Sequence, residues 1–256
     1  MQTDGVKHGG KLTIRASLVT TGRAMRVSEA IDSRISCRAF HDTPVPQSTV
    51  VAILEAAKRA PSGGNLQPWR VDVLTGAPLA EFLGIIRAKQ RTQPAGEGTE
   101  YPVYPPNLHE PYRSRRFKCG EDLYRTLGIP RENKAARIAH FARNYELFGA
   151  PVVLFFSIDR CMGVDQWADL GMFMQNVMLL AREHGLHTCP QEAWAIWYRT
   201  IGEFLQLPAD HMFFCGMALG RMDESSAVNK LRTERAQLAD FATLRGFDPA
   251  GVPGAA

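Results

Sequence analysis

The stretch APSGGNLQPW, residues 60–69, joins two segments with different hydrophobic periods. Before it, apolar side chains between Val50 and Ala57 recur at the spacing of one helical face, and Pro61 cannot continue that helix. After it, residues 69–75 are rich in β-branched and aromatic side chains, which indicates a strand. The sequence therefore predicts a helix, a short loop and a strand in this order.

The loop between this helix and strand has the composition of a ligand-binding loop. Its two glycines let the backbone approach a ligand closely, and its hydroxyl and amide side chains suit a polar planar partner. The candidate binding residues are Pro61, Ser62, Gly63, Gly64, Asn65 and Gln67. Taken alone, the loop is equally compatible with an ordinary turn.

A second candidate site lies upstream, at Arg34, Ser36 and Arg38. In an extended segment, residues two apart point the same way, so both guanidinium groups and the hydroxyl can converge on one anion. A solvated charged turn is the alternative interpretation.

The order of these motifs resembles that of the FMN-dependent nitroreductases. Within residues 29–69, an Arg-x-Ser-x-Arg segment runs into Ala39 and Phe40, a Pro-Val-Pro helix entry follows, and the 60–69 stretch completes the pattern. The segments CPQEAW at 189–194 and VNKLRTER at 228–235 are also similar to the family. The resemblance covers residues 27–247 and is closest to the branch that acts on nitrobenzoate-like compounds.

The resemblance implies an α+β fold with a mixed β-sheet flanked by helices, in a homodimer with FMN at its interface. Residues 25–247 would form a single domain. The 61–67 loop of one subunit would lie over the flavin whose phosphate is bound by the other subunit's Arg34, Ser36 and Arg38.

Two further segments would complete the flavin site. The resemblance implies that Gln191, Glu192 and Ala193 line the flavin ring and offer it a backbone N–H. Arg235 best matches the family's C-terminal phosphate-binding arginine, and Arg232 is the second choice. The family's Arg-x-Pro pattern is missing at this point, because Ala236 and Gln237 follow Arg235.

The activity implied is a ping-pong transfer of two electrons from NAD(P)H through FMN to a nitroaromatic compound or a quinone. Because the flavin carries the hydride chemistry, no catalytic side chain is expected, and the sequence shows neither a nucleophile triad nor a carboxylate pair. Two alternatives stay open. One is a flavin reductase or another flavin chemistry, such as reductive dehalogenation or flavin fragmentation; the other is a basic module that binds anions or nucleic acid.

Residues 90–130 form an expected insertion, either a lid or a surface excursion, because their first half is irregular and rich in proline. A basic run follows, with Arg113, Arg115 and Arg116 between Tyr112 and Phe117. This composition suits an aromatic ring that bears a carboxylate, so the three arginines are candidate substrate residues. A solvated charged face is the alternative.

Hydrophobic patterns predict the remaining elements. Continuous apolar runs at 152–158 and 212–219 are typical of strands covered on both faces, and Gly220 is expected to end the second. A helix that Asp165 could cap is apolar nearly all round, so it is expected either to lie at the centre of the domain or to have one face covered by another subunit; the resemblance favours both. The other expected helices span 79–89, 135–148 and 194–205.

Composition sets broad limits. The 256-residue chain is 45% hydrophobic, long enough for one sizeable core, and its net charge of +4 is too small to argue for nucleic acid. Five scattered cysteines show no metal or disulfide spacing, which favours a metal-free cytoplasmic protein. No apolar run is long enough for a membrane span. Residues 1–24 lack a secretory signal and are expected to be a flexible arm, and residues 248–256 a flexible tail.

Overall fold

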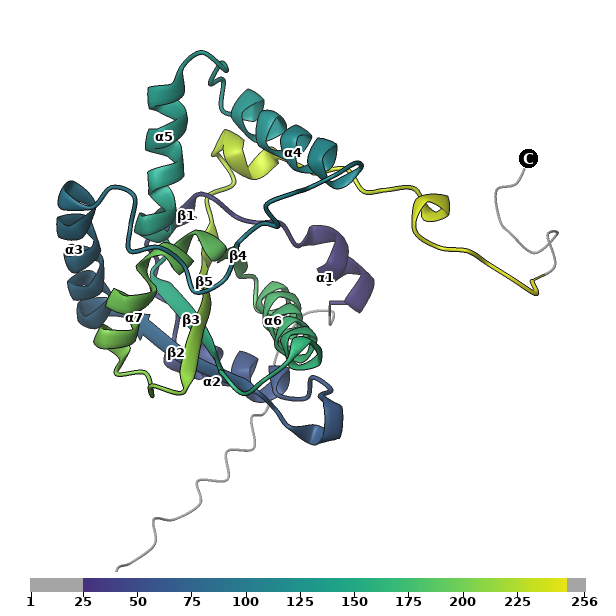
Figure 1. Ribbon diagram of the computed structural model, residues 1–256, viewed down its shortest axis with the longest axis horizontal. Coiled ribbons are helices and arrows are strands. Elements are labelled where there is room, and N and C mark those ends of the chain that lie inside the picture. The colour runs from purple at the N-terminus through teal and green to yellow at the C-terminus, as the bar shows by residue number, and fades with distance from the viewer. Residues whose placement is uncertain (1–24, 248–256) are drawn as a thin grey trace, which may run out of the picture.

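The computed structural model describes residues 25–247, which form a sheet with helices on both faces (Figure 1). The strands are β1 (Phe40–His41), β2 (Trp69–Thr75), β3 (Val152–Asp159), β4 (His187–Gln191) and β5 (His211–Met222). The α-helices are α1 (Val27–Ser33), α2 (Gln47–Ala57), α3 (Gly76–Thr92), α4 (Tyr112–Thr126), α5 (Lys134–Ala142), α6 (Val164–Glu183) and α7 (Tyr198–Leu205). The 3-10 helices are η1 (Gly63–Asn65), η2 (Arg143–Gly149), η3 (Glu192–Trp197), η4 (Ala227–Lys230) and η5 (Leu238–Asp240). The expectations for residues 1–24 and 248–256 concern parts of the chain outside the described residues.

The sheet has the order β1-β5-β3-β2, and β4 pairs with β5 as well. Each pair of these strands is antiparallel, and one parallel bridge joins Ser36 to Thr188. The predicted α+β class with a helix-flanked sheet is confirmed; the named strands pair with one another only antiparallel, and the parallel bridge is an isolated contact with Ser36, which lies outside them. None of the helices in the described part of the chain has the length and apolar character of a membrane span.

Strand β3 is buried on both faces, as its continuous apolar run predicts. Leu154 and Phe156 pack in a cluster with residues of α2 and α6, such as Ile53 and Phe173. The alternate residue Phe155 packs on the opposite face, with residues of α3, η3 and α7. Because successive side chains of a strand point to opposite faces, one strand anchors both helical layers.

Helix α6 crosses one face of the sheet, with Leu170, Phe173 and Val177 buried against it. Its N-cap is Gly163, where Asp165 was predicted, and Asp165 lies in the first turn. The backbone N–H of Gly163 donates to the side chain of Gln166 at 3.0 Å, so the N-cap lies two residues earlier than an acidic cap at 165 would place it. Met172 of this helix is 38% exposed.

Several elements differ from their predicted bounds for identifiable reasons. Strand β5 continues through Gly220, because a Cβ at this position would lie 2.8 Å from Pro151 and glycine permits the close approach. Strand β4 was not predicted as a strand, and it forms by pairing with β5. The predicted helix at 135–148 ends at Ala142 and continues as η2, since Leu147 and Phe148 have left-handed backbones.

The remaining helices are also shifted. Helix α3 is longer at both ends than the predicted 79–89. The predicted helix at 194–205 consists of the 3-10 helix η3 and then α7. The basic run at 112–118 is the first half of α4, and residues 93–111 before it are irregular, as expected.

Candidate active site

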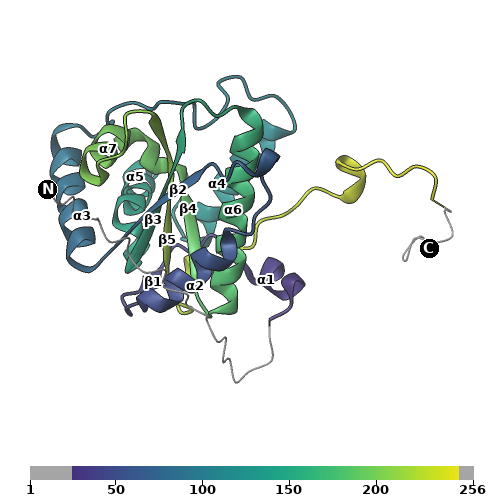
Figure 2. The same ribbon diagram turned by 90° about the horizontal axis from the view of Figure 1, so that it is seen from below.

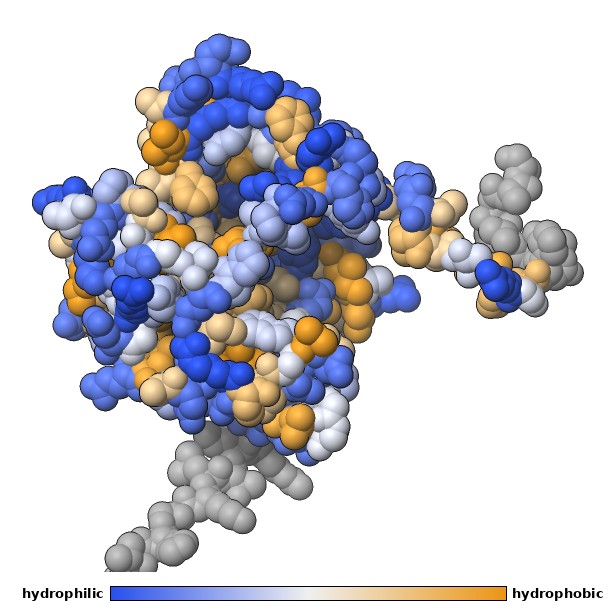
Figure 3. Space-filling view, viewed as in Figure 1, coloured by the Kyte–Doolittle hydropathy of each residue, from blue (hydrophilic) through white to orange (hydrophobic). Residues whose placement is uncertain are grey.

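A cavity of about 2060 Å³ lies between the sheet and the part of the chain that contains α4 and α5. Figure 3 shows the molecule hollowed in this region. The N-terminal loop after α1, helix α6, the start of η3 and the segment at 231–235 contribute to its wall. Residues from distant parts of the described sequence therefore line the same cavity.

The cavity brings four candidate arginines together: Arg34, Arg38, Arg232 and Arg235. Burial, and then the charge of Arg235, lower the pKa of Arg34. None of the four forms an ion pair with a carboxylate of residues 25–247; Arg38, for example, donates to the backbone carbonyl of Ser36 at 3.3 Å. A cluster of cations without a matching acid is suited to an anionic ligand.

The predicted segment Gln191, Glu192 and Ala193 also lines the cavity. The Gln191 amide donates to the backbone carbonyl of Asn144 at 2.8 Å, while its buried Oε1 has no hydrogen-bond partner within the described residues. Tyr145 donates to the carbonyl of Ala193 at 3.2 Å and fixes the segment from behind. Burial raises the pKa of the Glu192 carboxyl.

The 61–67 loop lies away from this cavity, against α6. The backbone N–H of Gly63 donates to the buried carboxylate of Asp169 at 3.1 Å. Asn65 and Gln67 have positive φ angles of 59° and 51°, a conformation that costs non-glycine residues free energy. Leu66 is nevertheless 54% exposed. Within one chain, the structure does not bring this loop together with the four arginines.

The three candidate substrate arginines of α4 have different surroundings. Arg113 reaches the cavity but pairs with Glu110 at 2.8 Å, whereas Arg115 does not line the cavity. Arg116 lines it, lies 3.9 Å above the ring of Tyr104 and has no carboxylate partner in the described part of the chain. Among these three arginines, Arg116 alone both lines the cavity and lacks a carboxylate partner in the described part of the chain.

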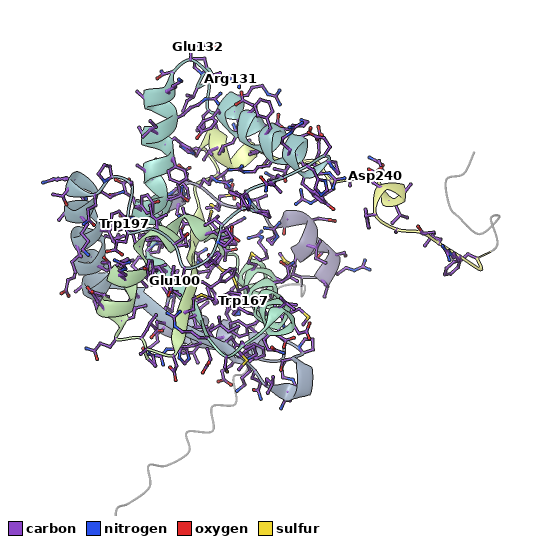
Figure 4. The ribbon with its side chains drawn as sticks, in the orientation of Figure 1. Glu100, Arg131, Glu132, Trp167, Trp197 and Asp240 are labelled. Carbon is purple, nitrogen blue, oxygen red and sulfur yellow. The ribbon has the colours of Figure 1, made fainter. Side chains whose placement is uncertain are left out.

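The irregular segment at 93–111 forms part of the cavity wall, with Pro94, Tyr104 and Leu108 among its lining residues. Three polar anchors hold it. The carboxylate of Glu97 accepts hydrogen bonds from Thr200 and from Lys89, at 2.9 Å for Lys89, and its side chain is 7% exposed. Glu100, labelled in Figure 4, pairs with Arg160 at 2.6 Å, and the hydroxyl of Tyr101 donates to the carbonyl of Phe214.

Comparisons with known proteins agree with this geometry. The model of the nitroreductase family matches residues 31–221. The 4-nitrobenzoate reductase of Pseudomonas putida is 38% identical over 221 residues, which cover 85% of this chain and 95% of that protein. The nitrobenzene nitroreductase of Ectopseudomonas oleovorans is likewise 38% identical, over 85% of this chain and 96% of its own.

Solved structures give the same result. The FMN and NADPH-dependent nitroreductase NfnB from Sphigopyxis sp. strain HMH has a TM-score of 0.84 at 46% identity and covers 87% of this chain and 100% of its own. The FMN-dependent NfnB from Mycobacterium smegmatis, solved with NADPH, has a TM-score of 0.77 at 29% identity and covers 85% of this chain and 96% of its own. On the family match and on relatives of this identity and coverage, the chain belongs to the nitroreductase family.

Proposed function

We propose that this protein is an FMN-dependent oxidoreductase that uses NAD(P)H to reduce nitroaromatic compounds. The observation that carries the proposal is the cluster of Arg34, Arg38, Arg232 and Arg235 in the cavity, none of which is ion-paired with a carboxylate of residues 25–247. The phosphate of FMN supplies the missing negative charge. Quinones, which also accept two electrons, are a second class of acceptor.

The residues present fit FMN at both of its ends. The arginines suit the phosphate, and the buried Oε1 of Gln191 lacks a donor that the N–H of a flavin ring can provide. FMN, when bound, supplies the chemistry of taking a hydride from the nicotinamide and passing it to the acceptor. The chain binds and orients the reactants. The segment at 93–111, which forms part of the cavity wall, limits the access of water to the cavity.

We infer a homodimer in which the 61–67 loop of one subunit completes the cavity of the other. The loop supports this arrangement, because its backbone is strained at Asn65 and Gln67, Leu66 is exposed, and Gly63 fixes it to Asp169 of α6. The exposed face of α6 around Met172 supports it as well. All five cysteines are free, which suits a reducing compartment such as the cytoplasm.

The finer substrate assignment is an anionic nitroaromatic compound such as a nitrobenzoate, with Arg116 as the carboxylate-binding residue. Its position over Tyr104 at the cavity wall supports this. A charge-assisted hydrogen bond to the substrate carboxylate contributes about 1.5–3 kcal/mol where the bound ring shields it from water, and less than about 1 kcal/mol where it stays exposed. We expect wild type to prefer 4-nitrobenzoate to neutral 4-nitrotoluene in kcat/KM, and Arg116→Ala to lose most of that preference. Arg115→Ala is the matched control and should keep it. Equal values for the two substrates in wild type would exclude the role of Arg116.

The function itself is tested on the purified full-length protein. It should be yellow, release FMN on denaturation and, in the absence of oxygen, oxidise more than one equivalent of NADH or NADPH per flavin only when a nitroaromatic or quinone acceptor is present. A protein that binds free flavin only as a dissociable substrate would be a flavin reductase. A colourless protein that binds neither FMN nor riboflavin would contradict the proposal and favour a basic anion-binding module.

A further inference from the structure

Asn229 connects the N-terminal and C-terminal segments that carry the four arginines. It lies in η4, and its side chain is almost completely buried, with 3% of the residue exposed. Its Oδ1 accepts the backbone N–H of Arg38 at 2.8 Å. Its Nδ2 donates to the carbonyls of Ala39 and Asp223, at 2.8 and 2.9 Å. This one amide therefore links the segment at 38–39 to the segment at 223–229, which are far apart in the sequence.

The same residue also contacts the C-terminal arginines. The backbone carbonyl of Asn229 accepts a hydrogen bond from Nη1 of Arg232 at 2.9 Å. The segment is further fixed because the N–H of Asp223 donates to the carbonyl of Ala39 at 3.0 Å. Asn229 therefore holds the backbone of Arg38 and the guanidinium of Arg232 in one unit.

An amide suits this position for an electrostatic reason. Four guanidinium groups in one cavity repel each other, so the backbones that carry them must be held by other contacts before a ligand binds. A carboxylate in place of the amide would attract the arginines and compete with an anionic ligand, and it would lose both donor contacts. Asparagine provides an acceptor and two donors without a net charge.

We propose that Asn229 is a positioning residue that preorganises the arginine cluster for a phosphate monoester and thereby makes the site prefer FMN to riboflavin. This inference rests on the proposed function, since it assumes that the flavin phosphate lies among these arginines. A residue that only stabilised the fold would affect both flavins equally, because they differ only in the phosphate. The ratio of the two affinities separates the two roles.

The experiment uses the full-length protein stripped of flavin and titrated with FMN and with riboflavin. We expect Asn229→Ala to weaken FMN binding by about 10- to 100-fold, in the range of one or two lost charge-assisted contacts, and to change riboflavin binding by less than about threefold. The matched control is Asn133→Ala. This change removes the hydrogen bond of 3.0 Å from the backbone N–H of Ala136 to the Asn133 side chain, at the start of α5. The position is close to Arg131 and Glu132, which are labelled in Figure 4. The variant should bind both flavins as wild type does.

A second variant covers the case in which Asn229→Ala does not fold. Asn229→Asp has the same shape, loses both donors and adds a charge that competes with phosphate, so FMN should again weaken more than riboflavin. Equal weakening of both flavins, or an unchanged preference for FMN in either folded variant, would overturn the role of Asn229 and leave the proposed function intact. Failure of wild type to bind either flavin would overturn both.

Discussion

At the scale of single residues, Arg34 and Arg38 carry the strongest prediction. Both line the cavity and lack a carboxylate partner in the described part of the chain, so either change to Ala should weaken FMN binding by about one to two orders of magnitude. Arg115→Ala, which removes a charge outside the cavity, is the control. Fluorescence titration measures the affinities. Full FMN affinity in both variants would place the phosphate elsewhere.

The buried ring of His187 makes the stability depend on pH. Nη1 of Arg182 lies 3.2 Å from Nδ1 of His187, and since arginine only donates, the ring is neutral at this nitrogen. Burial, and then the charges of Arg182 and Arg232, lower the pKa of His187 to about 4. In the unfolded chain the pKa is about 6.5, so the unfolded state binds the extra proton between these values and the free energy of unfolding rises with pH there.

Replacing this ring tests the sign of the effect. His187→Gln should reduce the rise in the free energy of unfolding between pH 4 and pH 6.5, when denaturant titrations of the variant and wild type are compared. The exposed His109→Gln is the control and should leave the slope unchanged. The same slope in wild type and His187→Gln would show that the ring does not stay neutral in the fold.

The sequence offers a local pattern for the candidate arginines, but none for the buried residues that hold the segments around the cavity. Arg34 and Arg38 were predicted as candidates because residues two apart in an extended segment point the same way. Asn229 and Glu97 have no such local pattern, since Arg38 and Asn229 are 191 positions apart and Glu97 and Thr200 are 103 apart. A buried amide or carboxylate that satisfies distant backbone groups becomes recognisable only when the fold brings its partners together.

At the scale of elements, the cavity wall at 93–111 is held to the body of the protein by the contacts of Glu97 with Lys89 and Thr200. Burial opposes the ionisation of Glu97, but hydrogen bonds from Thr200 and Lys89 outweigh it and lower the pKa of the carboxyl. We expect Glu97→Ala to raise KM for the nitroaromatic acceptor by about tenfold, roughly the effect of one lost buried charge-assisted contact, and to make the segment sensitive to proteases. For Glu97→Gln, both the KM and the protease sensitivity should lie between those of wild type and Glu97→Ala.

The control for the wall is Glu110→Gln, which breaks an exposed pair with Arg113 and should leave proteolysis unchanged. If Glu97→Ala resists proteases as well as wild type does, other contacts hold the wall.

The predicted elements were most accurate where local pattern and burial agree. Strand β2 begins and ends at the predicted residues, and β3 differs by one residue. The irregular end of the predicted 135–148 helix could not be predicted from pattern, because Leu147 and Phe148 are buried apolar residues with left-handed backbones that tertiary packing stabilises. The pairing of β4 likewise depends on β5, which follows it in the chain.

At the scale of the whole molecule, the C-terminal segment of the described chain runs away from the body in two perpendicular views (Figures 1 and 2). Its apolar residues Leu238, Phe241, Leu244 and Phe247 are exposed. Such a row of apolar side chains on an extended segment is suited to a second subunit. We therefore expect it to contribute to the proposed homodimer.

This expectation is tested with charge substitutions. Phe241→Glu combined with Leu244→Glu should raise the dimer dissociation constant by at least about tenfold, because each buried side chain of this size contributes about 1.5–3 kcal/mol. Ile138→Glu, on the exposed face of α5, is the control. Sedimentation velocity over a range of concentrations measures the effect. A double variant that dimerises as tightly as wild type would show that the segment lies outside the interface.

The central claim is that each active site combines the arginines of one chain with the 61–67 loop of its partner. Its most direct test unfolds and refolds together two variants, Arg38→Ala and the double variant Asn65→Ala/Gln67→Ala, and assays them at an FMN concentration that saturates wild type and leaves each variant alone nearly inactive. Half of the dimers formed at random are mixed, and each of these has one intact site, so we predict about a quarter of the wild-type nitroreductase activity. Activity no higher than that of the separately refolded variants, from a mixture that forms dimers, would contradict the shared site.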